Sequence, residues 1–426
     1  ATLPGSVAFV LYDTYGFPLE LTEEMCAEVG IKVDKDGFDK SMDDQRERAR
    51  ASSKQTSSVI SKNAYTEIAD RLGPVGFCGY DRTTRDSEVR AIISEGKEKE
   101  FISEGDTADI VLSDTPFYAE KGGQVGDTGV ITADNAIFEV EDTIYPVNDL
   151  IVHRGKLLKG TIKRNQTVTA SIDAARRRNI QRHHTATHLI HEALSKVLGQ
   201  HVRQAGSIVT PTFLRFDFNH FAPLSVDQIR EIESIVYEQV LLNLPVKTTV
   251  MPIDEAKKTG AKALFDEKYG DEVRVLEIPG YSTELCGGTH VKATGEIGVV
   301  KIVREEGIGS GVRRINAITG QNALETFQRF SFLSGTLASM LGEDLDSVLS
   351  RVGDLLDEKK ILERKNRELQ VKAALSDIEE NISPCATVNG VDLIMEKFED
   401  MNPDLLRQVG DRIKQKYPVA VIMLAG

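Results

Sequence analysis

Short apolar segments separated by turns mark residues 63 to about 170 as a β region. Val, Ile and Thr dominate these segments, and Gly-Asp and Asp-Thr pairs separate them. Segments of this length and composition are typical of strands joined by tight turns. We therefore predict a small antiparallel β domain in the form of a barrel. Examples of the predicted strands are residues 108–112, 129–132 and 136–140.

Helical patterns flank this β region on both sides. Residues 19 to about 62 are polar and helical in character, and residues 21–24 suggest an N-cap followed by two acids. Residues 171–200 predict another helix, and Ser225 with Gln228 resembles a capping box that opens the next one. Apolar residues follow that box at helical spacing. They are Val226, Ile229, Ile232, Val236 and Val240.

The pattern changes again towards the C-terminus. Residues 272–320 return to β character, residues 321–382 are helical, and a small α/β unit begins near residue 386. Leu355, Leu362 and Leu369 lie seven residues apart, and Lys359 and Asn366 stand where a second apolar seam would lie. This helical region is either a weak coiled coil, which permits a homodimer through the C-terminal region, or a long hairpin within one chain.

The two ends of the chain suggest a fragment. The chain opens with Ala1 and shows no pattern of a secretory signal. The apolar run of residues 418–426 predicts a strand buried on both faces, which needs neighbours that the sequence does not go on to supply. We therefore expect a piece of a longer protein. The alternative is a terminal strand inserted into an existing sheet.

Composition narrows the class of protein. A prior of roughly 150 residues per domain gives about three domains for 426 residues. Acids outnumber bases by 66 to 52, so the net charge of −14 excludes an overall basic surface. The apolar runs fall short of the roughly 18 residues that span a bilayer, so we expect no membrane partner. Four scattered cysteines favour a reducing compartment, and we expect a cytoplasmic protein, with an organelle as the alternative.

Two pairs of residues carry the most specific chemistry. His184 and His188 lie four residues apart on the predicted helix, and their side chains therefore share one face. No Glu follows His184, so the pair does not match the H-E-x-x-H protease motif. Cys286 and His290 enclose two glycines and a threonine, which suits a tight loop at a strand end. Three nitrogens and one sulfur form a donor set that fits Zn²⁺ best.

Each pair alone has a simpler interpretation. A His pair at this spacing occurs by chance, and a lone Cys is most often a buried apolar residue. Two compact and complementary pairs together favour the metal. His183 and His191 flank the helical pair and could substitute for one of its ligands.

Two further segments suggest contacts with a ligand. The glycine-rich segment 115–129 either joins strands by turns or lets another backbone or a ligand approach closely. Residues 154–182 contain nine bases and one acid, a local charge of +8 that suits phosphate contacts, although it can also be a solvated helix face. The arginines we favour are Arg176, Arg177, Arg178 and Arg182, and weaker candidates elsewhere are Lys262 and Arg313.

These motifs together resemble the alanyl-tRNA synthetase family. The resemblance rests on residues 5–18, 115–129, 184–188, 204–207, 214–218, 286–290 and 307–320, which occur in the order of that family's motifs. It implies a multidomain α+β protein with five parts. They are the end of a helical tRNA-recognition domain (1–62), the β-barrel of an editing domain (63–170), a zinc-binding editing core (171–320), a helical linker or coiled coil (321–382) and the start of a C-terminal tRNA-binding or dimerisation domain (383–426).

The resemblance also implies an activity in protein biosynthesis. It is the hydrolysis of alanine tRNA wrongly charged with Ser or Gly, errors that an alanine pocket cannot strongly reject. The resemblance further implies that the class II core, which uses ATP for aminoacylation, precedes the matched region and is absent from this chain. By resemblance, Thr187 and Gln204 line the editing pocket and Asp13 reads a G·U pair in the acceptor stem. The simpler roles are a hydroxyl bonded to its own helix for Thr187 and turn residues for Gln204 and Asp13.

Some alternatives stay open at this point. Four protein ligands favour a structural zinc, whereas displacement of one ligand would allow zinc to act in catalysis. No group stands out as the base that activates water. The chain could also be a free-standing editing hydrolase, or a zinc-stabilised tRNA-binding module without activity. Threonyl-tRNA synthetases carry a related editing domain, but the segment around Asp13 and the C-terminal helices favour the alanine family.

Overall fold

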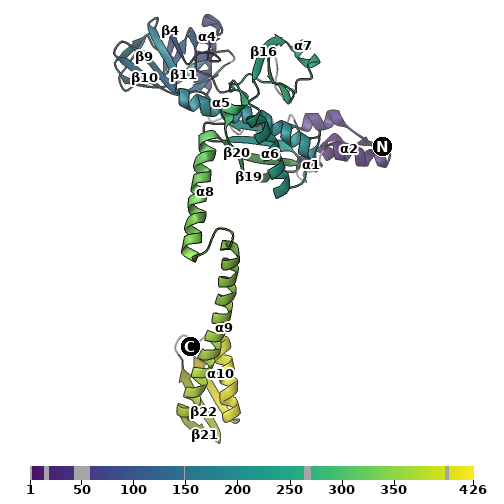
Figure 1. Ribbon diagram of the computed structural model, residues 1–426, viewed down its shortest axis with the longest axis vertical. Helices are drawn as coiled ribbons and strands as arrows, with labels where there is room; N and C mark the ends of the chain where they lie inside the picture. The colour runs from purple at the N-terminus through teal and green to yellow at the C-terminus, as the bar shows by residue number, and fades with distance from the viewer. Residues whose placement is uncertain (1, 14–18, 43–57, 148, 263–269, 399–402) are drawn as a thin grey trace. The chain divides into compact units, whose positions relative to one another are not determined.

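The computed structural model describes residues 2–13, 19–42, 58–147, 149–262, 270–398 and 403–426 (Figure 1). The chain is a mixed α+β protein and divides into two compact units, residues 1–327 and residues 328–426. Within the described residues, no helix combines the length and apolarity needed to cross a membrane. Each unit is described by itself.

Six strands close into a β-barrel within the described part of the first unit, as the turn-rich pattern predicted. They are β4 (Thr84–Ser94), β7 (Thr107–Leu112), β9 (Gly129–Ala133), β10 (Ala136–Ile144), β11 (Val152–Lys159) and β13 (Thr167–Ile172). The ring is complete because β13 pairs antiparallel with both β9 and β4. Along β10 the inward side chains Ala136, Phe138 and Val140 are buried. Ile137 between them is partly exposed, which is the period of two expected for a strand.

Short elements complete the barrel. Helix α4 (Ser58–Leu72) crosses the boundary predicted at residue 63, because its Tyr65 and Ile68 pack against barrel residues such as Val111. The small pairs are β3 (Gly76–Phe77) with β8 (Asp114–Thr115), β6 (Phe101–Ser103) with β12 (Thr161–Lys163), and β5 (Lys97–Glu98) at the end of β4.

Helix α5 (Ala174–Leu198) follows the barrel and confirms the helix predicted for residues 171–200. It packs with α6 (Val226–Leu241) on an antiparallel sheet ordered β14–β15–β20–β19. The capping box predicted at Ser225 and Gln228 is present at the start of α6. The strands are β14 (Gln204–Val209), β15 (Leu214–Asn219), β20 (Val312–Thr319) and β19 (Val300–Gly309).

A second, three-stranded sheet carries the loop that matters most for the site. Its order is β16–β17–β18, and the strands are antiparallel. The loop from Cys286 to His290 begins directly after β18. The elements are β16 (Lys247–Pro252), α7 (Ile253–Lys258), β17 (Glu272–Ile278), β18 (Ser282–Leu285) and the 3₁₀ turn η1 (Thr294–Ile297).

The N-terminal segment contains helices α1 and α2, a further helical stretch at residues 35–42 and a short strand pair. Helix α2 already begins at Leu19, so Thr22 lies inside the helix and the N-cap predicted at residues 21–24 is wrong. The elements are β1 (Thr2–Leu3), α1 (Gly5–Asp13), α2 (Leu19–Glu28) and β2 (Lys32–Val33).

Helix α8 (Gly320–Leu341) runs across the border between the units, and α9 (Val348–Asn381) belongs to the second unit. Both confirm the helical character predicted for residues 321–382. Leu355, Leu362 and Leu369 are exposed along α9, and a coiled coil through them stays a prediction.

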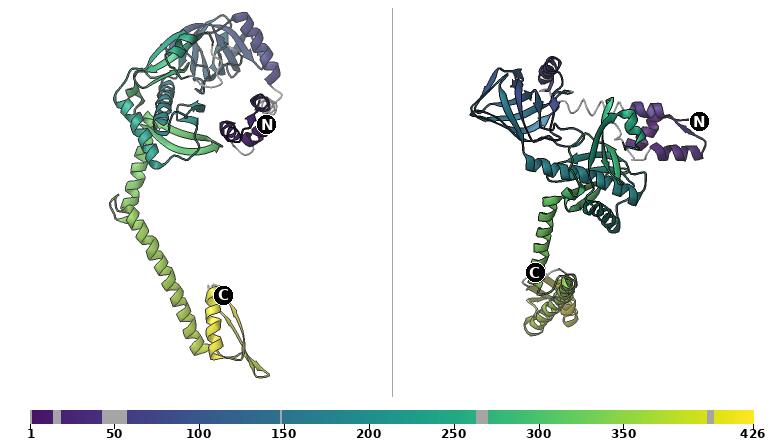
Figure 2. Two further views of the ribbon diagram at one scale, coloured as in Figure 1. Left: turned by 90° about the vertical axis from the view of Figure 1, so that its right-hand side faces the viewer. Right: turned by 45° about the horizontal axis from the view of Figure 1, so that its top comes forward.

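The second unit ends in a small α/β fold. Helix α10 (Pro403–Lys416) joins the parallel strands β22 (Val391–Lys397) and β23 (Ala420–Ala425), and β21 (Ala386–Val388) pairs with β22. Helix α10 lies beside the sheet (Figure 2). Burial alternates along β23, where Val421 is 56% and Met423 is 62% exposed. The described residues cover one face of β23, and burial of both faces, which was expected to need further neighbours, stays a prediction.

Candidate metal centre and pocket

Helix α5 fixes the first two candidate ligands. Its apolar residues Leu189, Ile190 and Ala193 are fully buried in the core, so the helix cannot rotate about its axis. His184 and His188 then project on one side, with ring centroids 5.4 Å apart and nearly parallel planes. This is the arrangement predicted from their spacing.

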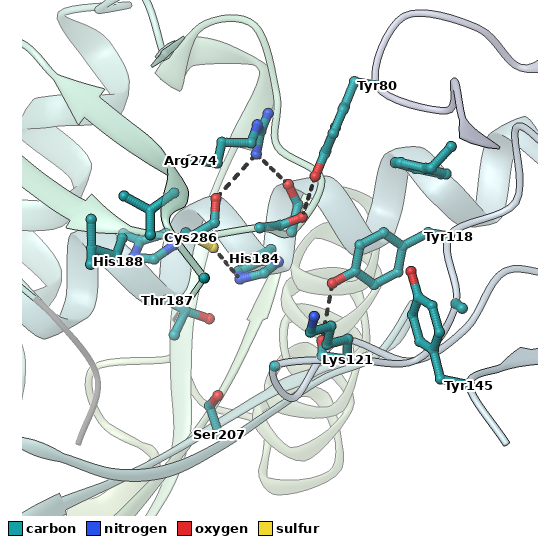
Figure 3. Close-up of a pocket in the computed structure, with 18 of the residues that line it drawn as sticks. Tyr80, Tyr118, Lys121, Tyr145, His184, Thr187, His188, Ser207, Arg274 and Cys286 are labelled. Carbon is teal, nitrogen blue, oxygen red and sulfur yellow. Dashed lines mark hydrogen bonds between the residues drawn. The ribbon is translucent and has the colours of Figure 1, made fainter. Parts of the chain in front are cut away.

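The loop after β18 brings the second pair to the same place. The Cys286 sulfur lies 3.3 Å from Nε2 of His184 and 3.3 Å from Nε2 of His290. Ligand atoms of all four residues lie within 4.8 Å of one another. Zn–N and Zn–S bonds of about 2.0 and 2.3 Å place the ligand atoms of a tetrahedral zinc roughly 3.3 to 3.6 Å apart. The two distances from the Cys286 sulfur match that spacing, and all four predicted ligands lie within 4.8 Å of one another. Figure 3 shows three of them, His184, His188 and Cys286, side by side.

Glycine is required where this loop meets helix α5. A Cβ atom on Gly288 would lie 2.0 Å from Cε1 of His184, whereas a Cβ on Gly287 would meet nothing within 4 Å. The backbone at Gly288 can pass the imidazole only because it has no side chain.

Hydrogen bonds select the ring nitrogen that each histidine offers. His188 Nδ1 lies 2.7 Å from a carboxylate oxygen of Glu284, which can only accept, so this nitrogen carries the proton. His290 Nδ1 lies 3.2 Å from the hydroxyl of Thr185. That hydroxyl donates its own proton to the Gln181 carbonyl at 2.9 Å and must accept from His290. In both rings Nε2 remains free to bind a cation.

His184 follows the same rule through the barrel. Its Nδ1 lies 2.8 Å from the side-chain oxygen of Gln124, and its Nε2 faces Cys286. Three imidazoles therefore present Nε2 to one point, each held from behind. Such supporting contacts orient the ligands of protein metal sites.

The electrostatics of the cluster suit a cation. Burial opposes the charged form of Cys286, but the imidazoles of His184, His290 and His188 outweigh it and hold the pKa of the thiol well below its usual range. Burial lowers the pKa of His290 to about 3, so its ring is neutral. Burial also opposes a charge on His188, but Glu284 and Cys286 outweigh it and raise its pKa to about 10. The same negative groups favour a metal cation at that ring.

One buried nitrogen atom indicates that the cluster binds a cation. His188 Nε2 is buried and has no hydrogen-bond partner among the described residues. An unsatisfied buried nitrogen is costly unless a cation completes it. The residues present therefore fit zinc by donor type and tautomer.

The two substitute ligands lie elsewhere. His183 accepts a hydrogen bond from the Thr319 backbone at 3.2 Å, on the sheet side of α5. His191 lies 3.4 Å from the Glu284 carboxylate and packs against Phe216. Neither belongs to the cluster.

A cavity of about 510 Å³ opens beside the cluster, and Thr187, Gln204 and Ser207 line it. Thr187 donates its hydroxyl proton to the His183 carbonyl at 2.9 Å, the bond to its own helix considered above. The hydroxyl oxygen can therefore still accept a hydrogen bond from the cavity side. Gln204 donates to the Ser207 hydroxyl at 3.1 Å.

The opposite wall is aromatic and basic, and sequence reasoning missed it (Figure 3). The Tyr80 hydroxyl donates to the Gly287 carbonyl at 2.7 Å, and the Arg274 guanidinium lies 4.0 Å from the centre of the Tyr80 ring. Lys121 and Tyr145 line the same cavity. The glycine-rich segment around Lys121 was the one hint in the sequence, because the other residues lie far apart along the chain.

The predicted phosphate-binding arginines have different environments. Arg177 is 3% exposed. Its guanidinium donates to Asp127, to the Gly79 carbonyl at 2.7 Å and to the Pro116 carbonyl at 2.9 Å. Arg177 is therefore a poor candidate for a contact with tRNA, because all three guanidinium nitrogens donate hydrogen bonds inside the protein. Arg178 one position later is exposed.

The other candidates are partly engaged. Arg176 donates to the Gly126 carbonyl at 2.7 Å, and Arg182 to the Glu296 carbonyl at 2.8 Å. Arg313 pairs with Glu305 at 2.5 Å, and Lys262 with Glu192 at 2.5 Å. Asp13 is the last residue of α1, and its side chain lies outside the described part of the chain.

Comparisons with known proteins relate the chain to tRNA synthetases. Residues 1–176 match the family model "tRNA synthetases class II (A)", and residues 273–316 match "Threonyl and Alanyl tRNA synthetase second additional domain". The chain is 45% identical over 427 aligned residues to the alanine–tRNA ligases of Burkholderia mallei (strain NCTC 10229) and Burkholderia pseudomallei (strain K96243). All of this chain is aligned, and it spans 48%, about half, of the length of these curated relatives.

Proposed function

Because the chain belongs to the alanyl-tRNA synthetase family, we propose that its described pocket hydrolyses alanine tRNA wrongly charged with Ser or Gly. The observation that carries this proposal is the position of the four-residue cluster, whose His184, His188 and Cys286 form one wall of the cavity. Thr187 and Gln204 line the same cavity. A site for a mischarged tRNA end needs such a polar cavity next to an electrophilic or anchoring group.

The reaction is an ester hydrolysis. A water oxygen forms a bond to the carbonyl carbon of the aminoacyl group, and the bond from that carbon to the ribose oxygen breaks. The water proton passes to the departing ribose oxygen, so the products are the free amino acid and the uncharged tRNA. His184, His188, Cys286 and His290 would hold a zinc ion, which when bound would supply a fixed positive charge beside the cavity and fasten the ligand loop to helix α5. We assign it this role because four protein ligands close a tetrahedral site.

Thr187 offers a basis for selecting serine. Its hydroxyl proton is already used on the His183 carbonyl, so towards the cavity the oxygen can only accept. A serine hydroxyl can donate to it, and the methyl group of alanine cannot. Leaving one buried polar group unpaired costs about 1–3 kcal/mol, which disfavours alanine. Gln204 and Ser207, bonded to each other, form the neighbouring polar wall.

The remaining walls suit the terminal nucleotide of tRNA. Tyr80 and Tyr145 can stack on a base, and Lys121 and Arg274 carry positive charge into the cavity. Exposed arginines such as Arg178 can contact phosphates outside it. We further propose that ATP-dependent aminoacylation belongs to a part of the family protein that this chain does not span.

Single-turnover release of amino acid from charged alanine tRNA tests the function. We expect Ser and Gly to be released at least about tenfold faster than Ala, and His184→Ala to abolish the difference. His201→Ala is a matched control, because His201 is exposed and pairs with His220 at 3.0 Å, outside the cluster. Equal release of Ser and Ala would refute the proposal. Binding of tRNA without release would instead identify an inactive tRNA-binding module.

A further inference from the structure

Gln124 of the glycine-rich segment is fully buried and reaches out of the barrel into the metal cluster. Its loop is fixed against β14, because Val209 donates to the Gly123 carbonyl at 2.7 Å and Val125 donates to the Val209 carbonyl at 3.1 Å. Gly123 has a φ of 81°, and a Cβ on it would lie 2.5 Å from the Ser207 carbonyl oxygen. The glycine therefore allows the close approach that delivers Gln124.

The side-chain amide of Gln124 makes three hydrogen bonds at the cluster. Its oxygen lies 2.9 Å from the Thr289 backbone nitrogen and 2.8 Å from His184 Nδ1. Its nitrogen donates to the Thr289 hydroxyl at 2.9 Å. A backbone N–H can only donate, so the Thr289 amide fixes which end of the Gln124 amide is the oxygen. His184 Nδ1 must then donate to that oxygen, which leaves Nε2 of His184 as the acceptor facing Cys286.

We propose that Gln124 is a positioning residue of the metal centre, through which the barrel sets the tautomer of His184 and holds the ligand loop at Thr289. The inference rests on the proposed metal centre and not on the hydrolytic activity. The glycine-rich segment would then support the metal ligands in addition to joining strands by turns. It also makes the barrel part of the metal site, although all four candidate ligands lie outside it.

Two variants of similar size separate this role from simple packing. Gln124→Met fills the same volume without an acceptor, and Gln124→Glu keeps an oxygen acceptor for His184 and Thr289. Zinc affinity is measured by competition with a chromophoric chelator, and Co²⁺ absorption reports the geometry of the bound metal. We expect Gln124→Met to bind zinc roughly 10- to 100-fold more weakly, as is typical for loss of such a support, and Gln124→Glu to stay within a few-fold of the parent.

Gln166→Met is the matched control, because Gln166 accepts from the Lys163 backbone at 2.9 Å in a barrel turn. It should leave zinc affinity and the Co²⁺ spectrum unchanged. Unchanged affinity of Gln124→Met would overturn the inference, and so would equal weakening of Gln124→Met and Gln124→Glu. A parent protein that binds zinc but does not release Ser from tRNA would refute the proposed function while leaving this inference intact.

Discussion

The sulfur of Cys286 lies 3.3 Å from Nε2 of His184, although 102 residues separate them in the chain. Contacts around the site hold the two segments together. The Tyr281 hydroxyl donates to the Leu189 carbonyl at 2.9 Å and thereby ties the turn before β18 to helix α5. The cluster is therefore a product of tertiary packing, and a bound ion should in turn stabilise that packing.

Metal removal should lower the stability of the first unit. A ligand present at 1,000 times its dissociation constant stabilises the folded state by about 4 kcal/mol. We expect one zinc per chain, a lower melting temperature after chelation, and neither property in Cys286→Ala. The check is metal analysis together with thermal unfolding, with and without chelator. An identical melting temperature for the metal-loaded and chelated protein would contradict the prediction.

Two adjacent glycines should differ sharply in their tolerance of alanine. The new Cβ of Gly288→Ala would collide with the His184 ring at 2.0 Å, whereas that of Gly287→Ala meets nothing within 4 Å. We expect Gly288→Ala to lose at least tenfold in zinc affinity, and Gly287→Ala to remain close to the parent. Chelator competition measures both. Equal affinities would show that the loop moves freely away from α5.

Substitution of two adjacent arginines should lower the stability of the fold in one case and weaken tRNA binding in the other. Arg177 forms a buried ion pair with Asp127, and removing one partner of such a pair costs about 3–5 kcal/mol. Arg177→Ala should therefore lower the urea midpoint strongly. Arg178→Ala should leave it unchanged, weaken tRNA binding and reduce the salt dependence by about one phosphate contact. The reverse outcome would restore Arg177 as a tRNA contact.

Thr187 should control the preference for serine. Thr187→Val keeps the shape of the side chain but removes the acceptor, so we expect release of Ser from tRNA to fall roughly 10- to 100-fold. Release of Gly, which has no hydroxyl, should change much less. Thr187→Ser keeps the hydroxyl and serves as the control. A uniform loss for Ser and Gly would indicate a general defect of the pocket and contradict this role.

The barrel should lose stability in mild acid through His153. Its ring is fully buried between the Thr115 hydroxyl at 2.7 Å and the Ile110 carbonyl at 2.9 Å. Burial lowers its pKa from 6.5 to about 4, so the unfolded chain binds a proton first as the pH falls. The contribution, on the order of 3 kcal/mol, is complete above pH 6.5 and lost between pH 6.5 and 4.

Resonances of the His153 ring test this directly. Their position should stay constant as the pH falls from 7 to 5, because the buried ring stays neutral over that range. The urea midpoint should fall over the same range. Titration of His153 near pH 6.5 in the folded protein would contradict its burial as a neutral ring.

Local sequence determined the elements and half of the site. Helix α5, the capping box at Ser225 and the barrel strands follow from apolar spacing and turn residues, which act over a few neighbouring positions. The spacing of His184 and His188 alone places both rings on one helix face. The likeness to alanyl-tRNA synthetases also followed from short motifs, and the comparisons bear it out.

The partners that complete those elements come from packing between distant parts of the chain. Three contacts could not be predicted from the sequence, because each joins positions at least 50 residues apart. They are the ion pair of Arg177 with Asp127, the stacking of Arg274 on Tyr80 and the hydrogen bond of Gln124 with His184. The sequence also could not show which face of β23 the described residues cover, since burial depends on neighbours and not on the strand's own hydrophobicity. Periodicity is a property of the chain, whereas desolvation and pairing are properties of the packed fold.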